Sequence, residues 1–283
     1  MNAPQYWLAL SRPRFWMYVL GPAVLGAMAG WGVAGSIDSG VILLLVTVLV
    51  FFTFPLNLFI YGINDLFDAD TDALNPKKQK QEVLLESARR QSLRRILILI
   101  TILSALMLLF LPTPARIAWC LFLFLGWSYS APPLRWKIRL LLDAYSNVLY
   151  VFPAWVTYGL LTSQWLDSRW LILGLFWTAG MHTFSAVPDI SADRTANVRT
   201  SAVIFGREKA LLFVGLNWIM AVAIALLLAG PLGLIMLIYP SLVVVVYFNW
   251  QPIERVYWWF PWINAIAGFC SFWAIYFVNS PIL

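Results

Sequence analysis

Charged residues are scarce in this sequence: Asp, Glu, Lys and Arg make up 11% of 283 residues, whereas a soluble domain usually carries about 25%. This scarcity excludes an ordinary cytosolic enzyme and a disordered tail protein. There are only two cysteines, Cys120 and Cys270. Both lie in apolar runs, where we expect them to pack rather than form a disulfide or a metal site. The opening MNAPQYWLALSRPRFW lacks the basic start and apolar stretch of a cleaved signal.

Apolar residues are abundant, at 61% hydrophobic and 16% aromatic. A membrane-spanning helix needs roughly 20 apolar residues, so the chain has room for about nine spans with short connections and no soluble domain. We therefore predict an all-α, polytopic membrane protein that forms one domain over residues 1–283. Turn-rich breaks between the apolar runs place the nine spans at Phe15–Trp31, Gly40–Ile63, Ile96–Leu111, Ile117–Tyr129, Ala144–Leu161, Trp170–Val187, Ala210–Leu228, Leu232–Phe248 and Val256–Val278.

The basic residues are distributed asymmetrically about these spans. With nine spans, 17 of the 19 Lys and Arg residues fall on one side, and only Arg116 and Arg169 fall on the other. The positive-inside rule then predicts a cytoplasmic amino terminus and an external carboxy terminus, with the plasma membrane as the expected location. The basic residues flank apolar runs and form no soluble stripe, so no nucleic-acid partner is predicted.

Two acidic segments fall on the predicted cytoplasmic side. Four crossings separate them, and an even number returns the chain to the same face. Residues spaced by three or four lie along one side of a helix, and both segments have this spacing. The first contains Asn57, Tyr61, Asn64, Asp65, Asp68 and Asp72, and the second contains His182, Ser185, Asp189 and Asp193.

Carboxylates stacked along a helix repel one another, so a cation must offset them. Oxygen ligands favour a hard cation such as Mg²⁺, which completes its shell with water and substrate phosphate. We expect Asp68 and Asp189 to face the cytoplasmic rim and to contribute little to packing. The basic residues near these segments complete the composition of a diphosphate clamp: Lys77, Lys78, Lys80, Arg135, Lys137, Arg194 and Arg199.

Other interpretations remain open from the residues alone. Each acidic segment taken singly is compatible with a solvated loop, His182 with a helix-end histidine, and Asn57 and Asn147 with hydrogen bonds between helices. A membrane transporter is a further alternative. Transporters, however, usually place ionisable groups near the bilayer midplane, whereas here they gather at one interface.

The motifs resemble the UbiA superfamily of intramembrane prenyltransferases. Residues 64–72, NDLFDADTD, fit its signature NDxxDxxxD, and residues 189–193, DISAD, fit its second signature, DxxxD. Residues 129–137, YSAPPLRWK, resemble the loop between spans four and five in related branches. The resemblance implies a helical bundle with a cytoplasmic active site that binds an allylic diphosphate with Mg²⁺.

The resemblance also implies roles for individual residues. Asn64, Asp68 and Asp72 would hold one Mg²⁺ ion with Asp65 near it, while Asp189 and Asp193 would hold another, and the aspartates other than Asp65 would thereby be catalytic. The expected contacts to the remaining diphosphate oxygens are Lys137, Arg135, Arg194, Lys77, Tyr129 and Arg14, with Arg12 as a further candidate. His182 and Asp189 are possible proton acceptors, and so is the diphosphate itself.

Within the superfamily, LSRPRFW at residues 10–16 and LNPKK at 74–78 look most like lycopene elongases of C50 carotenoid biosynthesis. This narrower resemblance implies transfer of a five-carbon unit from dimethylallyl diphosphate to lycopene, with hydration in some members. An aromatic or tetrapyrrole acceptor, such as hydroxybenzoate, homogentisate, naphthoate or chlorophyllide, is the alternative within the superfamily.

Overall fold

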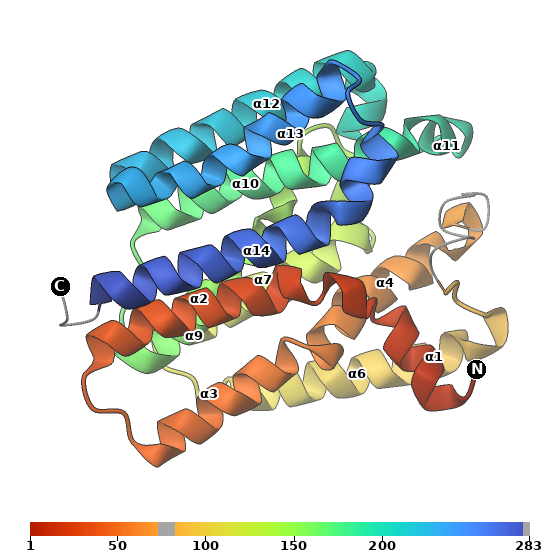
Figure 1. The fold of residues 1–283 in the computed structure, drawn as a ribbon. Coiled ribbons are helices and arrows are strands. Elements are labelled where there is room, and N and C mark those ends of the chain that lie inside the picture. Colours follow the sequence, from red (N-terminus) through yellow and green to blue (C-terminus); the bar gives the residue numbers. More distant parts are fainter. Residues whose placement is uncertain (73–82, 280–283) are drawn as a thin grey trace. The chain divides into compact units, whose positions relative to one another are not determined.

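The computed structural model describes residues 1–72 and 83–279, apart from the side chains of residues 70–72 and 278–279. Every regular element within these ranges is a helix and none is a strand, which confirms the all-α prediction for the described residues (Figure 1). The chain falls into two compact units, Met1–Arg135 with Phe152–Trp165 and Trp136–Val151 with Leu166–Leu283.

The first unit contains six longer helices and several short ones among its described residues. An Asn2 capping box starts the first helix, and the Asp38 carboxylate caps the third by accepting hydrogen bonds from Gly40 and Val41. The elements are α1 (Ala3–Leu10), η1 (Pro13–Phe15), α2 (Met17–Ala34), α3 (Ser39–Phe51), α4 (Phe54–Asp72), η2 (Ser87–Arg89), α6 (Arg90–Met107), α7 (Thr113–Ser130) and α9 (Phe152–Thr162).

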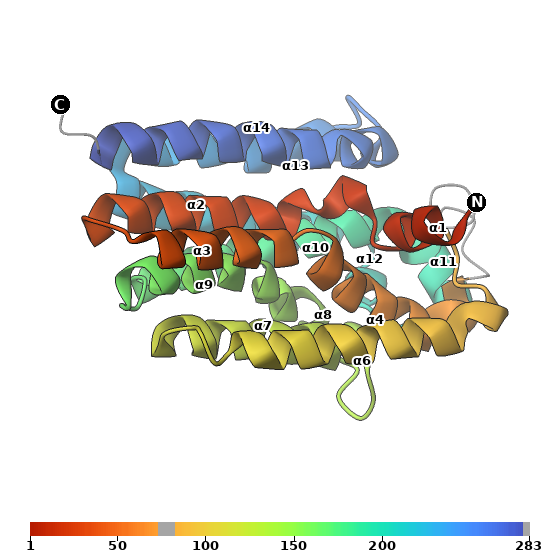
Figure 2. The ribbon, with the colours of Figure 1, turned by 90° about the horizontal axis from the view of Figure 1, so that it is seen from below.

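Small residues let α2 and α9 pack closely, and the two helices run side by side in Figures 1 and 2. A Cβ atom at Gly26 would lie 2.2 Å from the Ala154 carbonyl oxygen, so only glycine fits at that contact. Thr157 Oγ1 donates a hydrogen bond of 2.7 Å to the Ala23 carbonyl oxygen across the same interface. Close approach with an interhelical hydrogen bond is typical of helices that pack within a bilayer.

The second unit is organised around two long helices that lie side by side, α10 (Ser168–Ala186) and α12 (Ser201–Ala229) (Figure 1). Rings of Phe184, Trp218, Tyr239 and Phe260 pack against one another with centroids 5.4–6.1 Å apart and form its core. The remaining elements are η3 (Trp136–Ile138), α8 (Leu142–Tyr145), η4 (Ser146–Val151), η5 (Val187–Asp189), α11 (Ile190–Thr195), η6 (Gly230–Leu237), α13 (Ile238–Tyr247) and α14 (Ile253–Asn279).

Each predicted span corresponds to helical structure, but several predicted continuous helices are broken. The span Gly40–Ile63 is divided into α3 and α4 at residues 52–53, next to Pro55. The span Ala144–Leu161 begins at the end of α8, continues through the 3-10 helix η4, and enters α9 at Phe152, next to Pro153. Proline lacks a backbone N–H and clashes with the preceding turn, so it is found near helix starts.

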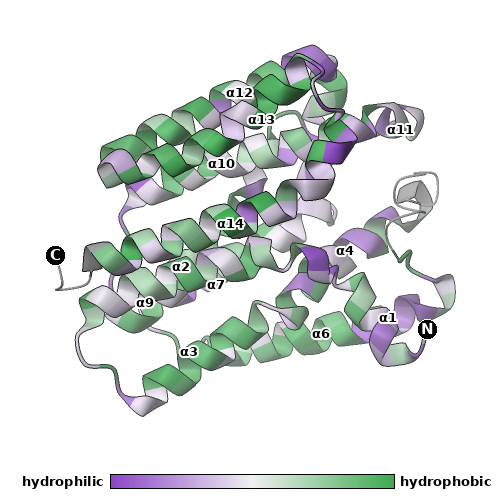
Figure 3. Ribbon diagram, viewed as in Figure 1, coloured by the Kyte–Doolittle hydropathy of each residue, from purple (hydrophilic) through white to green (hydrophobic). Residues whose placement is uncertain are grey.

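Five segments of the described chain are long and apolar enough to cross a membrane: Met17–Ala34, Ser39–Ala69, Ser168–Thr195, Ser201–Tyr247 and Ile253–Phe277. The count of nine spans therefore stays a prediction. In Figure 3 the apolar colour dominates α3, whereas α1 carries both hydrophilic and hydrophobic residues. The two cysteines, which we expected to pack within apolar runs, are both free thiols, and both are exposed.

Candidate active site

The first acidic motif, Asn64–Asp72, occupies the carboxy-terminal half of α4, as its spacing predicts. Asp65 and Asp68 are buried, with 3% and 5% of their surface exposed, and Asn64 is half-buried. The expectation that Asp68 faces solvent is wrong, because so little of its surface is exposed. Asp72 is the last residue of α4, and its side chain lies outside the described part of the structure.

Two arginines supply positive charge to these buried carboxylates. Arg12 donates to Asp65 Oδ1 over 2.8 Å, and its guanidinium lies 4.7 Å from the centroid of the Tyr61 ring. Arg135 lies 3.6 Å from Asp68 Oδ1. Both arginines have left-handed backbones, with φ of 54° and 41°, a conformation that costs non-glycine residues about 1 kcal/mol or more. The surrounding fold therefore holds both arginines against a local backbone preference.

A hydroxyl from α7 orients the amide at the start of the motif. Ser130 Oγ donates to Asn64 Oδ1 over 3.0 Å, and Ser130 is buried. The adjacent Tyr129, a predicted contact to diphosphate, is half-buried at the same end of α7. Arg14 lies in η1 with its guanidinium 5.7 Å from the Phe15 ring centroid. Lys77 lies outside the described residues.

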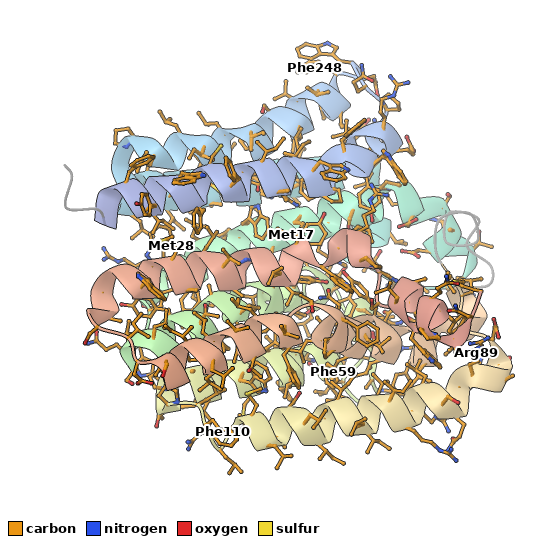
Figure 4. All side chains as sticks on the ribbon, turned by 60° about the horizontal axis from the view of Figure 1, so that its bottom comes forward. Met17, Met28, Phe59, Arg89, Phe110 and Phe248 are labelled. Carbon is orange, nitrogen blue, oxygen red and sulfur yellow. The ribbon has the colours of Figure 1, made fainter. Side chains whose placement is uncertain are left out.

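The amino-terminal helix α1 is tied to the chain that follows the first motif. Tyr6 Oη donates to the Leu84 carbonyl oxygen over 3.2 Å and accepts from the Glu86 N–H over 2.9 Å. The Arg89 guanidinium lies 4.2 Å from the centroid of the Tyr6 ring. Burial raises the pKa of the Tyr6 hydroxyl, while the Glu86 N–H lowers it by a smaller amount. Figure 4 labels Arg89, at the amino-terminal end of α6, and Phe110, beyond the other end of this helix.

The second acidic motif, Asp189–Asp193, lies in the second unit and departs from the predicted continuous helix. α10 ends at Ala186, Pro188 introduces the 3-10 turn η5, and α11 follows. Asp189 ends η5 and Asp193 lies in α11; both are half-buried. Arg194, the next residue, is exposed.

Three further polar residues of the second unit lie in its helices. Lys137, in η3, is buried with 8% of its surface exposed. His182, in α10, lies within electrostatic range of both Asp143 and Asp189. Asp143, in α8, is 1% exposed and accepts hydrogen bonds from the backbone N–H and the hydroxyl of Ser201.

The donor set of both motifs suits a hard divalent cation. The amide oxygen of Asn64 and the carboxylates of Asp68, Asp189 and Asp193 are oxygen ligands of the kind that Mg²⁺ binds together with water and phosphate oxygens. Within the described residues, no three Asp, Glu, His or Cys side chains cluster closely enough to hold a metal ion by themselves. The residues present fit a metal that receives part of its shell from a substrate.

Sequence reasoning missed two features of this site. It treated Arg12 as a contact to diphosphate, whereas the structure pairs Arg12 with Asp65, 53 residues away. It assigned no role to Asp143, which lies in no acidic motif.

Asn57 and Asn147 bond locally rather than between distant helices. Asn57 donates to the Phe52 and Thr53 carbonyls, and Asn147 donates to the Asp143 carbonyl.

Comparison with known proteins assigns the chain to a family. The profile of the UbiA prenyltransferase family matches residues 19–253. The lycopene elongase/hydratase of Haloarcula japonica is 36% identical over 264 residues, covering 93% of this chain and 88% of the relative. The lycopene elongase/hydratase of Halobacterium salinarum is 35% identical over 268 residues, covering 93% and 94%.

The fold is also shared with a solved structure. A UbiA homologue from Archaeoglobus fulgidus bound to GPP and Mg²⁺ matches 95% of this chain and 99% of its own, with a TM-score of 0.71 and 22% identity. The same homologue bound to DMAPP and Mg²⁺ matches with a TM-score of 0.69 and 22% identity, over 95% and 98% of the two chains. At this identity, the likeness establishes the helical fold.

Proposed function

The chain belongs to the UbiA prenyltransferase family and is a prenyltransferase, and from this premise we propose that it transfers the dimethylallyl group of dimethylallyl diphosphate to lycopene with the help of Mg²⁺. The observation that carries the proposal is the pair of aspartate motifs, one on α4 and one on η5 and α11. The elongase relatives, which are 35–36% identical over 93% of the chain, support lycopene as the acceptor.

In this proposal the first motif binds one Mg²⁺ ion through Asn64, Asp68 and Asp72. The Ser130 hydroxyl donates a hydrogen bond to Asn64 Oδ1 and so fixes the orientation of the Asn64 amide. Arg135 limits the repulsion that Asp68 would otherwise exert on its neighbours along α4. Asp65, although predicted near this metal, is engaged by Arg12.

The second motif binds another Mg²⁺ ion through Asp189 and Asp193. Bound Mg²⁺ would act as a Lewis acid on the diphosphate oxygens and stabilise the negative charge of the leaving group. Lys137, Arg135, Arg194, Lys77, Tyr129 and Arg14 remain the proposed contacts to the other diphosphate oxygens. Lys137 is buried, so its surroundings have a lower dielectric constant than water. The attraction between its ammonium group and a diphosphate oxygen is therefore stronger than it would be in water.

The apolar helices suit the rest of the reaction. Departure of the diphosphate leaves an allylic cation that water would quench, so apolar and aromatic walls must exclude water around it. The exposed surfaces of α3 and α6 carry Leu43, Val46, Ile98 and Leu99, which fit contact with lipid. An acceptor as apolar as lycopene can reach such a protein directly from the bilayer.

We further propose that residues 1–283 act as one prenyltransferase domain, since the family match runs through both compact units. We propose the plasma membrane as its location, and the basic residues favour an orientation with both acidic motifs and the amino terminus in the cytoplasm and the carboxy terminus outside.

The test is expression in bacteria engineered to accumulate lycopene, followed by liquid chromatography and mass spectrometry of the pigments. The unsubstituted chain should yield carotenoids heavier by one or two five-carbon units, and the masses will show whether water is added. Asp68→Asn and Asp189→Asn should each reduce product by about 100-fold or more, because a metal ligand is lost. Lys137→Ala should cost less, about tenfold, because one charge-assisted contact among several is removed.

Asp38→Asn is the matched control. Asp38 is an aspartate that caps α3, and Asn caps helices equally well, so product should be unchanged. Undiminished product from membrane-inserted Asp68→Asn or Asp189→Asn would contradict the metal assignment. Unchanged lycopene from an inserted, unsubstituted chain would contradict lycopene as acceptor and favour an aromatic or tetrapyrrole acceptor.

A further inference from the structure

Asp143 is a buried carboxylate in the second unit that the proposed chemistry does not use. It lies at the start of α8 with 1% of its surface exposed. Charged side chains are rarely buried in this way unless they are paired or hydrogen-bonded. The hydrogen bonds of Asp143 therefore indicate what the residue does.

Both carboxylate oxygens of Asp143 are engaged by one residue, Ser201. Oδ2 accepts from the Ser201 backbone N–H over 2.6 Å, and Oδ1 accepts from the Ser201 hydroxyl. Ser201 is the first residue of α12, so the carboxylate satisfies an amide at a helix amino terminus, where negative charge is stabilised by the helix dipole. With both oxygens accepting hydrogen bonds from Ser201, Asp143 is a structural anchor between α8 and the start of α12.

Further hydrogen bonds extend the anchor toward Lys137. The Asp143 N–H donates to the Arg139 carbonyl over 3.0 Å, and the Arg139 N–H donates to the Trp136 carbonyl over 2.9 Å. The Leu141 N–H donates to Ser201 Oγ over 2.8 Å, although Leu141 has a left-handed backbone with φ of 66°. The whole turn between Lys137 and Asp143 is thus fixed to the start of α12, and part of it is strained.

The two helices joined by the anchor, α8 and α12, also pack against the helices on either side of the second acidic motif. α12 follows Asp193 by a short connection, and α11 packs against it. α8 packs against α10, which leads into Asp189. Asp143 therefore joins the segment that carries Lys137 to the segment that carries Asp189 and Asp193.

We propose that Asp143, through its two hydrogen bonds to Ser201, is a positioning residue that sets Lys137 relative to the second acidic motif for binding of a metal-bound diphosphate. The inference rests on the proposed function, because it gives Lys137 a diphosphate as its target. Asp143 itself touches neither the metal nor the diphosphate, so its effect passes through Lys137.

The test is a double-mutant cycle read by calorimetric binding of inorganic pyrophosphate with Mg²⁺ to the purified full chain in detergent. In Asp143→Asn, one oxygen becomes an NH₂ group that cannot accept from Ser201, and the negative charge at the start of α12 is removed, so the charge-assisted bonds to Ser201 are weakened. Asp143→Asn and Lys137→Ala should each weaken pyrophosphate binding by about tenfold. The double variant should bind no more than about twofold more weakly than Lys137→Ala alone, because coupled residues are not additive.

Two variants separate positioning from general stability. Tyr145→Phe removes another bond between the same segment and α12, the 3.2 Å bond from Tyr145 Oη to Asn217 Oδ1, and should leave pyrophosphate binding within twofold. Ser201→Ala keeps the backbone bond to Asp143 and should weaken binding less than Asp143→Asn. If Asp143→Asn does not fold, Ser201→Ala with Lys137→Ala completes the cycle.

The outcomes are distinct. Unchanged binding in Asp143→Asn, or losses that multiply in the double variant, would overturn the positioning role and leave the proposed function standing. Failure of the unsubstituted chain to bind pyrophosphate with Mg²⁺ would overturn the proposed function and this inference with it.

Discussion

At the scale of single residues, the first motif depends on arginines that lie far from it in the sequence. Arg12 and Asp65 have 13% and 5% of their side-chain surfaces exposed, so both charges are largely removed from water. Pairing offsets the cost of burying them, and the loss of one partner leaves the other charge uncompensated. Arg12 also stacks on Tyr61, which a lysine would do less well because its ammonium is compact and not planar.

Arg12→Ala should therefore destabilise the protein by about 3 kcal/mol, measured as a lower thermal unfolding midpoint in detergent. Arg12→Lys should recover only part of this loss. Adding Asp65→Asn to Arg12→Ala should restore stability, because no unpaired charge remains. The single variant Asp65→Asn should leave Mg²⁺ affinity nearly unchanged if Asp65 serves Arg12. A tenfold or greater drop in Mg²⁺ affinity would instead make Asp65 a metal ligand.

At the scale of elements, α1 acts as a strap across the chain that follows the first motif. Its only described polar contacts to residues 84–86 pass through the Tyr6 hydroxyl, which both donates and accepts. The Arg89 guanidinium against the Tyr6 ring adds a cation–π contact from η2. The Tyr6 side chain thus joins the amino-terminal helix to the residues that lead into α6.

The strap should weaken in alkaline solution. The native state holds the Tyr6 proton more tightly than the unfolded state, because burial raises the pKa of the hydroxyl. Its contribution is therefore fully present below pH 10, the ordinary pKa of tyrosine, and is lost as pH rises through the higher native pKa. Tyr6→Phe should lower stability by about 1 kcal/mol at neutral pH and remove this alkaline loss.

Unfolding midpoints from pH 7 to 11 measure both effects. Tyr247→Phe is the control, because Tyr247 is an exposed residue on α13 and its hydroxyl has no part in the strap. The alkaline decline should persist in this control. An equally steep decline in Tyr6→Phe would show that another group is responsible.

Local spacing predicted much of this fold, and contacts between distant residues account for most of what it missed. The spacing of Asn64, Asp65 and Asp68 predicted the helix α4. The same reasoning predicted one helix through Asp189, but the chain changes to the 3-10 turn η5 at Pro188, whose missing backbone N–H removes one bond of the α-helical ladder. The pairing of Arg12 with Asp65 depends on tertiary packing over 53 residues, which no periodic pattern contains.

At the scale of the whole molecule, charge distribution predicts the orientation in the membrane. Only Arg116 and Arg169 among 19 basic residues fall outside the predicted cytoplasmic segments, and basic loops resist translocation. Arg169 is paired with Asp167 and Arg116 donates to the Leu108 and Leu111 carbonyls. Asp167 thus offsets the charge of Arg169, whereas Arg116 keeps its charge and is held by backbone carbonyls after α6.

Labelling of single cysteines in intact cells tests this orientation. Cys120 and Cys270 are exposed, so both are first replaced by serine. A membrane-impermeant thiol reagent should then label Ser36→Cys, which lies between α2 and α3, because we expect that connection to lie outside. It should label Asn197→Cys, between α11 and α12, only after the membrane is permeabilised. Both positions are exposed, so a difference in labelling reports the side of the membrane.

The carboxy terminus tests the number of crossings. Nine spans place it outside when the amino terminus is cytoplasmic, so alkaline phosphatase fused after Leu283 should be active and a fluorescent protein fused there should be dark. An inactive phosphatase fusion together with external labelling of Ser36→Cys would require an even number of crossings. Labelling of Asn197→Cys in intact cells would contradict the cytoplasmic placement of the second acidic motif, since only α11 separates this position from Asp189.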